Sequence, residues 1–204
     1  MLKNACLLAT VFFLFIAAAS CGKEDPNAKP EVKRGVAPIA DTEIAVIEME
    51  NPAFGKIKIE LYPNIAPQMV EQFKALAKSG FYDGVAFHRI NPQVVQGGDP
   101  NSKDNDPAND GRGKSDRPNV PAELSDIKYE RGIVGAARSA PYNSANSQFF
   151  ITLGRTPGWD TEYTVFGKVI EGMNNVDTLA GVPKSGERPL EPVKIKSITF
   201  ESRQ

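Results

Sequence analysis

An arginine and a glutamine lie close together in a short apolar region of the chain. Arg89 stands in the run 85–90, Val-Ala-Phe-His-Arg-Ile, and Gln96 ends the run 93–96, just before Gly97-Gly98. The two runs flank Asn91-Pro92, which predicts a strand, a corner and a second strand. An arginine in such a run either reaches solvent along its stem or donates hydrogen bonds to a group held against the sheet. The run alone favours the solvent-facing arginine, because charged side chains are usually exposed.

Most classical catalytic groups are scarce. The chain has one histidine, His88, and two cysteines, Cys6 and Cys21, which both lie near the N-terminus. A Ser-His-Asp site would have to use His88, although the adjacent Arg89 would point to the opposite face of the same strand. We therefore expect His88 to be a structural histidine that is satisfied by hydrogen bonds.

The only clustered carboxylates lie in the loop 100–118. Its Asp104, Asp106, Asp110 and Gly111 suggest a calcium loop, but placing Gly111 at the sixth position puts Arg117 at the twelfth, where a glutamate is required. A solvated loop is the preferred interpretation and weak calcium binding stays open. No metal and no cofactor is predicted.

The segments around this region predict a mainly β domain with two helices. Alternation over Glu43–Met49 and Lys56–Leu61 indicates an antiparallel hairpin. Apolar residues at helical spacing predict a helix over 66–79, and a shorter one is expected near 173–180. The last strand, 193–200, changes phase at Ser197, where a β-bulge would restore the inward direction.

Four motifs, in the same order, resemble the cyclophilin-type peptidyl-prolyl isomerases. They are FHRI at 87–90, QGGD at 96–99, GIVGAARSAPYNSANSQFFITL at 132–153 and TVFGKVIEG at 164–172. The resemblance covers roughly residues 43–201 and implies a closed eight-stranded antiparallel β-barrel capped by two helices. The isomerase domain is expected to span 41–204.

The resemblance also implies roles for individual residues. Arg89 matches the catalytic arginine, which donates toward the prolyl nitrogen, and Gln96 matches the glutamine that orients it. The positions that match substrate-binding residues are Phe87, Val94, Ala137, Arg138, Gln148, Phe150, Trp159 and Tyr163. Among these, the main chain of 137–138 is expected to pair with the substrate, and Phe150 and Val94 to form walls of the proline pocket.

This sequence departs from the family pattern at the pocket. The segment between Ile90 and Gln96 is one residue short, and Gln93 stands nearest to the place of a missing pocket phenylalanine. Trp159 is one place later than the usual tryptophan, at a position where a leucine usually packs against the proline. We expect Trp159 to fill the space of the missing side chain. Gly158, at the usual tryptophan position, predicts weak cyclosporin binding.

The N-terminus carries an export signature. Residues 1–20 contain one charge, Lys3, and an apolar run, which is typical of a cleaved signal peptide. The sequence Ala-Ala-Ser-Cys-Gly at 18–22 resembles a bacterial lipobox, so we expect cleavage before Cys21, lipidation of Cys21 and a flexible tether over 21–40. Ordinary signal cleavage near Ser20 is the alternative. The predicted location is the cell envelope, on a membrane and facing the periplasm or the cell surface.

Two functions are compatible with this sequence. The first is an isomerase that acts on proline-containing segments of exported proteins, and the second is a barrel that binds such segments as a chaperone without turnover. The presence of Arg89, Gln96 and Phe150 favours the isomerase. Charges are balanced, with 24 Lys and Arg against 25 Asp and Glu, so no basic surface indicates nucleic acid. A monomer is expected.

Overall fold

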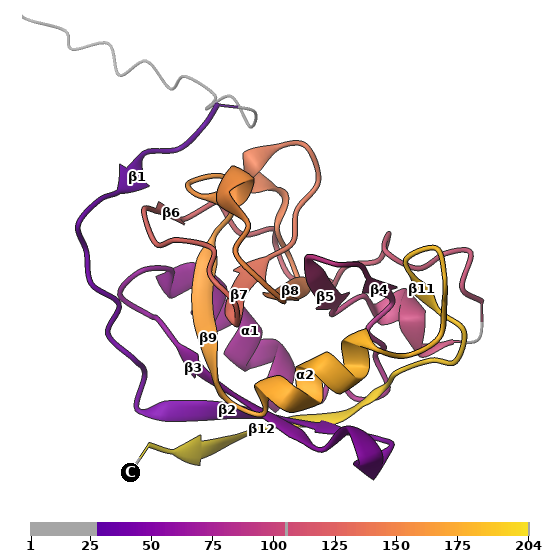
Figure 1. Ribbon diagram of the computed structural model, residues 1–204. Coiled ribbons are helices and arrows are strands. Elements are labelled where there is room, and N and C mark those ends of the chain that lie inside the picture. The colour runs from indigo at the N-terminus through magenta and orange to yellow at the C-terminus, as the bar shows by residue number, and fades with distance from the viewer. Residues whose placement is uncertain (1–27, 105, 204) are drawn as a thin grey trace, which may run out of the picture.

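The computed structural model describes residues 28–104 and 106–203, which fold around one curled antiparallel sheet (Figure 1). The main sheet has eight strands in the order β12-β2-β3-β9-β7-β8-β5-β4. Two two-stranded sheets, β1-β6 and β10-β11, lie beside it. The strands are β1 Val32–Lys33, β2 Glu43–Met49, β3 Lys56–Leu61, β4 Arg89–Ile90, β5 Val94–Gly97, β6 Leu124–Ser125, β7 Ile133–Ala136, β8 Phe149–Thr152, β9 Val165–Glu171, β10 Lys184–Ser185, β11 Arg188–Pro189 and β12 Ile195–Ser202.

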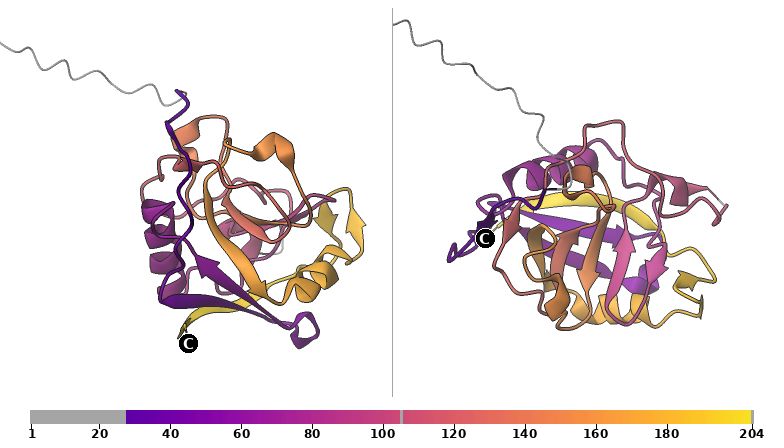
Figure 2. Two further views of the ribbon diagram at one scale, coloured as in Figure 1. Left: turned by 60° about the vertical axis from the view of Figure 1, so that its left-hand side comes forward. Right: turned by 90° about the horizontal axis from the view of Figure 1, so that it is seen from above.

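Two α-helices, α1 Pro67–Lys78 and α2 Met173–Ala180, flank the curled sheet at opposite ends (Figure 2). Short 3-10 turns occur at Pro52–Phe54, Pro100–Lys103, Tyr142–Ser144 and Pro157–Trp159. The apolar stripe of α1 is buried as its spacing predicts, with Met69 and Phe73 fully inaccessible in the main core. None of the helices in 28–104 and 106–203 has the length and hydrophobicity to cross a membrane.

The sheet is an open half-barrel, so the expected closed barrel is wrong. No ladder pairs the edge strands β4 and β12 in the described chain, and an isolated bridge joins Ala86 and Lys194, which precede these two strands. Backbone hydrogen bonds extend this seam: the Gly84 N–H donates to the Ile195 carbonyl, and the Ile195 N–H donates to the Val85 carbonyl. The Phe87 N–H donates to the Val193 carbonyl. The chain is not in a strand at 87–88, and from Arg89 onward it pairs with β5 and does not continue the seam.

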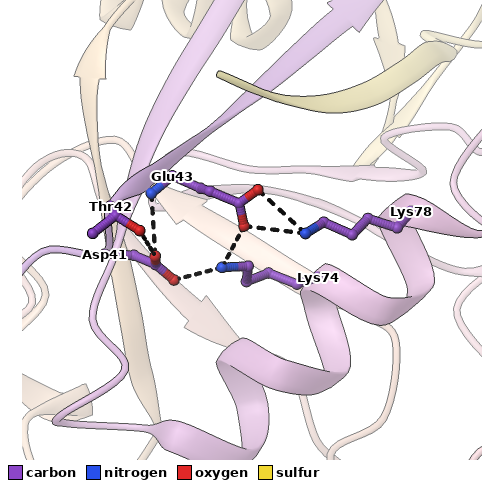
Figure 3. Close-up of polar contacts among 5 residues, drawn as sticks. All are labelled: Asp41, Thr42, Glu43, Lys74 and Lys78. Atoms are coloured by element: carbon purple, nitrogen blue, oxygen red, sulfur yellow. Dashed lines mark hydrogen bonds and ion pairs between the residues drawn. The ribbon is translucent and has the colours of Figure 1, made fainter. Parts of the chain in front are cut away.

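The other local predictions agree with the structure. The β2–β3 hairpin pairs Ile47 with Ile57, and α2 occupies the expected residues. The register of β12 against β2 shifts between Ile195 and Ser197, which confirms the predicted bulge. Lys74 and Lys78 of α1 bind Asp41 and Glu43 at the start of β2 and thereby tie this helix to the sheet (Figure 3).

The part of the expected tether that the structure describes lies against the domain. Val32 and Lys33 pair in parallel with Leu124 and Ser125, and the Lys33 ammonium donates to the Ile65 carbonyl at 2.7 Å. Further along, Asn64 binds the backbone of 37 and 39 through its side-chain amide. We call residues 32–39 the docked strap. The expected tether as a whole is polar and lacks periodicity, which predicts a free linker, whereas several backbone groups of the docked strap find partners on the domain.

Candidate active site

The antiparallel corner of β4 and β5 brings Arg89 and Gln96 together. The two residues are direct register partners, and Arg89 Nη1 donates to Gln96 Oε1 at 3.2 Å. The Gln96 amide in turn donates to Gln148 Oε1 at 3.0 Å, and the Gln148 amide donates to the Gly113 carbonyl at 2.9 Å. The row Arg89, Gln96 and Gln148 therefore forms a connected set of hydrogen bonds, as the sequence predicts for its first two members.

A carboxylate that sequence reasoning missed completes this row. Glu187 lies in the turn between β10 and β11, and its Oε2 accepts from Arg89 Nε at 2.5 Å. Its Oε1 accepts from Asn91 Nδ2 at 2.9 Å. Hydrogen bonds from Arg89 and Asn91 hold the pKa of Glu187 below its ordinary value. No motif marked Glu187, because it is far from Arg89 in sequence and belongs to a short exposed hairpin.

Aromatic side chains pack into an apolar cluster next to the row, and we call this cluster the aromatic slot. The Phe150 ring lies 5.1 Å from that of Trp159 and 5.9 Å from that of Tyr163, centroid to centroid, and both contacts are edge-on. Val94 is fully buried in the same apolar cluster. Phe150 is the register partner of Gln96, so the slot and the hydrogen-bonding row share neighbouring strands. Gln93 is exposed and builds no wall, whereas Trp159 packs against Phe150.

Phe87 lies away from this slot, contrary to its predicted role. Its side chain is fully buried in the main core, edge-on to Phe149. Only the resemblance to the family suggested this role, and the packing of the ring places Phe87 in the main core instead.

Ala137 and Arg138 are near the slot, but much of their hydrogen-bonding capacity is used within the protein. The Ala137 N–H donates to the Gln148 carbonyl at 2.9 Å, so it is not free for a substrate backbone. The Arg138 guanidinium donates to the carbonyls of residues 139, 140 and 162. It also lies 4.3 Å from the Tyr142 ring centroid and 4.7 Å from that of Tyr163. Arg138 thus packs its guanidinium against the Tyr163 ring and helps to fix the position of that ring.

His88 is buried, with 8% of its surface exposed, but neither ring nitrogen has a hydrogen-bond partner among the described residues. The expected satisfied histidine is therefore not what the structure shows. Burial lowers the pKa of His88 although the nearby Asp99 carboxylate opposes this shift. A neutral imidazole is the form that such a site favours.

A polar hollow of about 450 Å³ adjoins Gln96 and Gln148. Its described lining includes Arg112, Lys114 and Arg138 and no acidic side chain, so its electrostatic potential favours anions. Among residues 28–104 and 106–203, no group of three or more His, Cys, Asp or Glu side chains is placed to hold a metal ion, and this includes the described part of the loop 100–118.

An arginine fork beside an aromatic cluster on a β half-barrel is the arrangement that the resemblance to the cyclophilin-type isomerases predicts. Comparison with known proteins agrees with this class. The sequence pattern of the family described as cyclophilin type peptidyl-prolyl cis-trans isomerase/CLD matches residues 45–200. The chain therefore belongs to the cyclophilin-type peptidyl-prolyl cis-trans isomerases.

Individual relatives support the same assignment. A probable peptidyl-prolyl cis-trans isomerase of Brucella suis is 43% identical over 154 residues, covering 72% of this chain and 79% of the relative. A peptidyl-prolyl cis-trans isomerase of Schizosaccharomyces pombe is 40% identical over 158 residues, covering 74% and 96%. A Cryptosporidium parvum cyclophilin-type isomerase, solved in the presence of the dipeptide Ala-Pro, superposes with a TM-score of 0.70 at 31% identity, covering 78% of this chain and 99% of that structure.

Proposed function

We propose that Arg89 catalyses isomerisation by donating a hydrogen bond to the prolyl nitrogen as the Xaa-Pro bond twists. The barrier to rotation, about 18–20 kcal/mol, comes from amide resonance, which is lost when this nitrogen becomes pyramidal. A donor that binds the nitrogen only in the twisted state lowers the barrier without tightening substrate binding. The slot of Phe150, Trp159 and Tyr163 would hold the ring, and Gln96 would hold the guanidinium.

The observation that carries this proposal is that the Arg89 guanidinium is held by two hydrogen bonds and keeps unused N–H donors. Gln96 binds Nη1 and Glu187 binds Nε, which fixes the guanidinium at the edge of a hollow of about 440 Å³. Arginine has five N–H donors, so three remain for a substrate. Prolyl isomerisation needs no metal, nucleophile or cofactor, and the row supplies none of these.

Kinetics of Arg89 variants test the mechanism. We expect Arg89→Ala to lower kcat/KM for cis-to-trans conversion of an Xaa-Pro peptide by about 10²- to 10³-fold, as for the loss of one transition-state donor. Arg89→Lys should recover little, because a lysine lacks the planar fork. Arg131→Ala is the matched control, since Arg131 pairs with Asp177 outside the site. If Arg89→Ala folds and isomerises the peptide at the same rate as the unsubstituted protein, the mechanism is refuted. If the unsubstituted protein folds but does not accelerate isomerisation, the alternative of a chaperone that binds without turnover is favoured.

We further propose that the enzyme works in the cell envelope as a monomer on exported proteins, anchored by a lipid on Cys21. The support is the sequence of residues 1–22, with its apolar run and lipobox-like end, and these residues lie outside the described structure. Fractionation of cells that express the full chain or Cys21→Ser tests the anchor. The normal protein should stay with the membranes and the variant should be released. Equal release of both would indicate ordinary signal cleavage.

A further inference from the structure

The backbone of Glu187 is held at the site by its own β10–β11 hairpin and by strand β4, which is distant in sequence. Glu187 follows Gly186, whose φ of 62° lets the β10–β11 hairpin turn tightly. The Glu187 carbonyl accepts from the Ile90 N–H at 2.6 Å, and β11 lies beside β4 (Figure 1). The backbone of Glu187 is therefore fixed next to the strand that carries Arg89.

The side chain of Glu187 is fixed as well. Its Oε2 accepts from Arg89 Nε, and its Oε1 accepts from Asn91 Nδ2. The Asn91 Oδ1 accepts the backbone N–H groups of Gln93 and Val94, at 2.9 and 3.0 Å, and this holds the Asn91 amide in the β4–β5 turn. The same turn thus sets the positions of Arg89, of the carboxylate that binds it and of the amide that binds the carboxylate.

These contacts hold the guanidinium at two separate points. Glu187 takes the N–H of Nε, and Gln96 takes one N–H of Nη1. Because the guanidinium is planar, two fixed donors set both its location and its plane. Nη2 and the second Nη1 donor have no acceptor within the described residues and adjoin the hollow of about 440 Å³ that Gln96 and Glu187 also line.

We infer that Glu187 is a positioning residue of the isomerase, which aims the free Nη groups of Arg89 at the substrate. A carboxylate beside an arginine could instead compete with the substrate for the fork. Competition is disfavoured here because both Glu187 oxygens are already engaged, one on the Nε side and one on Asn91, and neither accepts from Nη2. The inference rests on the proposed role of Arg89.

Steady-state kinetics by exchange NMR on an Xaa-Pro peptide separate the possibilities. We expect Glu187→Ala to lower kcat about tenfold with little change in KM, because a misaimed donor loses transition-state binding and not ground-state binding. Glu187→Gln keeps an acceptor for Nε and should retain more activity than Glu187→Ala. Lys184→Ala is the control within the same hairpin, since Lys184 donates to the Ala180 carbonyl and not to the row.

A double-mutant cycle distinguishes this inference from the proposed function. If Glu187 acts through Arg89, then Glu187→Ala should change nothing further in an Arg89→Ala background, measured on the residual rate. An equal loss in both backgrounds, no loss in the single variant or a rise in kcat/KM would overturn the positioning role. A normal rate for Arg89→Ala itself would instead refute the mechanism on which the inference rests.

Discussion

Trp159 packs edge-on against Phe150, with ring centroids 5.1 Å apart. Phe150 comes from the rigid strand β8, whereas Trp159 ends a short 3-10 turn and remains partly exposed. The pair gives the proposed proline-binding slot one wall on strand β8 and one on a 3-10 turn. Since Gln93 faces solvent, the tryptophan supplies apolar surface that the β4–β5 corner lacks.

We expect Trp159→Ala to raise KM for a proline peptide by about tenfold, because a large aromatic surface is lost from the slot. Trp159→Phe should recover most of the affinity. The measurement is KM and kcat by exchange NMR, with the thermal midpoint as a check on folding. Unchanged kinetics in Trp159→Ala would show that the tryptophan does not replace the missing phenylalanine.

Gly135 lets Phe150 lie close to the neighbouring strand. A Cβ at this position would lie 2.3 Å from Phe150 Cζ and 2.8 Å from Tyr129 Oη. We therefore expect Gly135→Ala to displace the Phe150 ring and to cost about 1–3 kcal/mol of unfolding free energy through overpacking. Chemical denaturation and peptide kinetics on one preparation measure both effects.

Gly154→Ala is the matched control, because a Cβ there meets nothing within 4 Å. The control should change neither stability nor kcat/KM by a measurable amount. If Gly135→Ala behaved like Gly154→Ala, the slot would be more adaptable than its packing indicates.

Sequence reasoning succeeded where local rules decide the outcome. The facing of Arg89 and Gln96 follows from two short strands around Asn-Pro, and the bulge near Ser197 follows from a break in alternation. Trp159 was placed through its position relative to a family motif. Each of these features depends on residues close in sequence or on a pattern with a fixed period.

The misses depend on contacts between distant segments. Glu187 reaches Arg89 across 98 residues, and the docked strap pairs through only two residues of β1, too few for a periodic signal. The site role of Phe87 was expected from its place in the FHRI motif, whereas its ring packs in the main core against Phe149. The sheet stays open because the pairing between 84–87 and 193–195 stops after a few hydrogen bonds. A local sequence pattern does not predict where such pairing between distant segments ends.

The docked strap should stabilise the domain. A protein beginning at residue 41 loses the pairing of Val32 and Lys33 with β6 and the hydrogen bond from Gly35 to Asp126. At about 0.5–1.5 kcal/mol for each hydrogen bond, we expect a loss of about 1–3 kcal/mol, kept low by solvent exposure. A protein beginning at residue 28 is the control. Equal denaturation midpoints for the two would show that 32–39 behaves as a free linker.

The polar hollow beyond Gln148 should select acidic side chains close to the proline. Arg112 and Lys114 line it, both are exposed, and no acid among its described lining residues neutralises them. We expect a glutamate in place of alanine in the peptide to lower KM by about two- to fivefold at low salt, with the gain lost in 1 M salt.

Lys114→Glu should reverse that preference while leaving the rate on an uncharged peptide unchanged, because Lys114 lines neither the hollow at Arg89 nor the aromatic cluster. A charge preference that persists in Lys114→Glu would place the anion site elsewhere. Peptides with the glutamate on either side of the proline locate the hollow relative to the chain direction of the substrate.

The ion cluster at the start of β2 predicts how stability depends on pH (Figure 3). Lys74 Nζ lies 2.7 Å from both Asp41 Oδ2 and Glu43 Oε2. Burial alone would raise the pKa of Asp41, but the hydrogen bond and charge of Lys74 lower it, and hydrogen bonds from Lys74 and Lys78 lower that of Glu43. A carboxyl with a lowered pKa favours the folded state above its unfolded pKa, so this contribution is lost as the pH falls from about 4 through the lowered pKa of the folded protein.

Removing the central cation should therefore cost most at neutral pH. We expect Lys74→Met to lower the unfolding free energy by about 1–3 kcal/mol at pH 7, because the mostly buried Asp41 loses its ion-pair partner. The difference from the normal protein should shrink between pH 5 and pH 3, as both carboxyls become protonated. Denaturant titrations across this range measure it. A pH-independent difference would mean that Lys74 contributes through the packing of its stem alone.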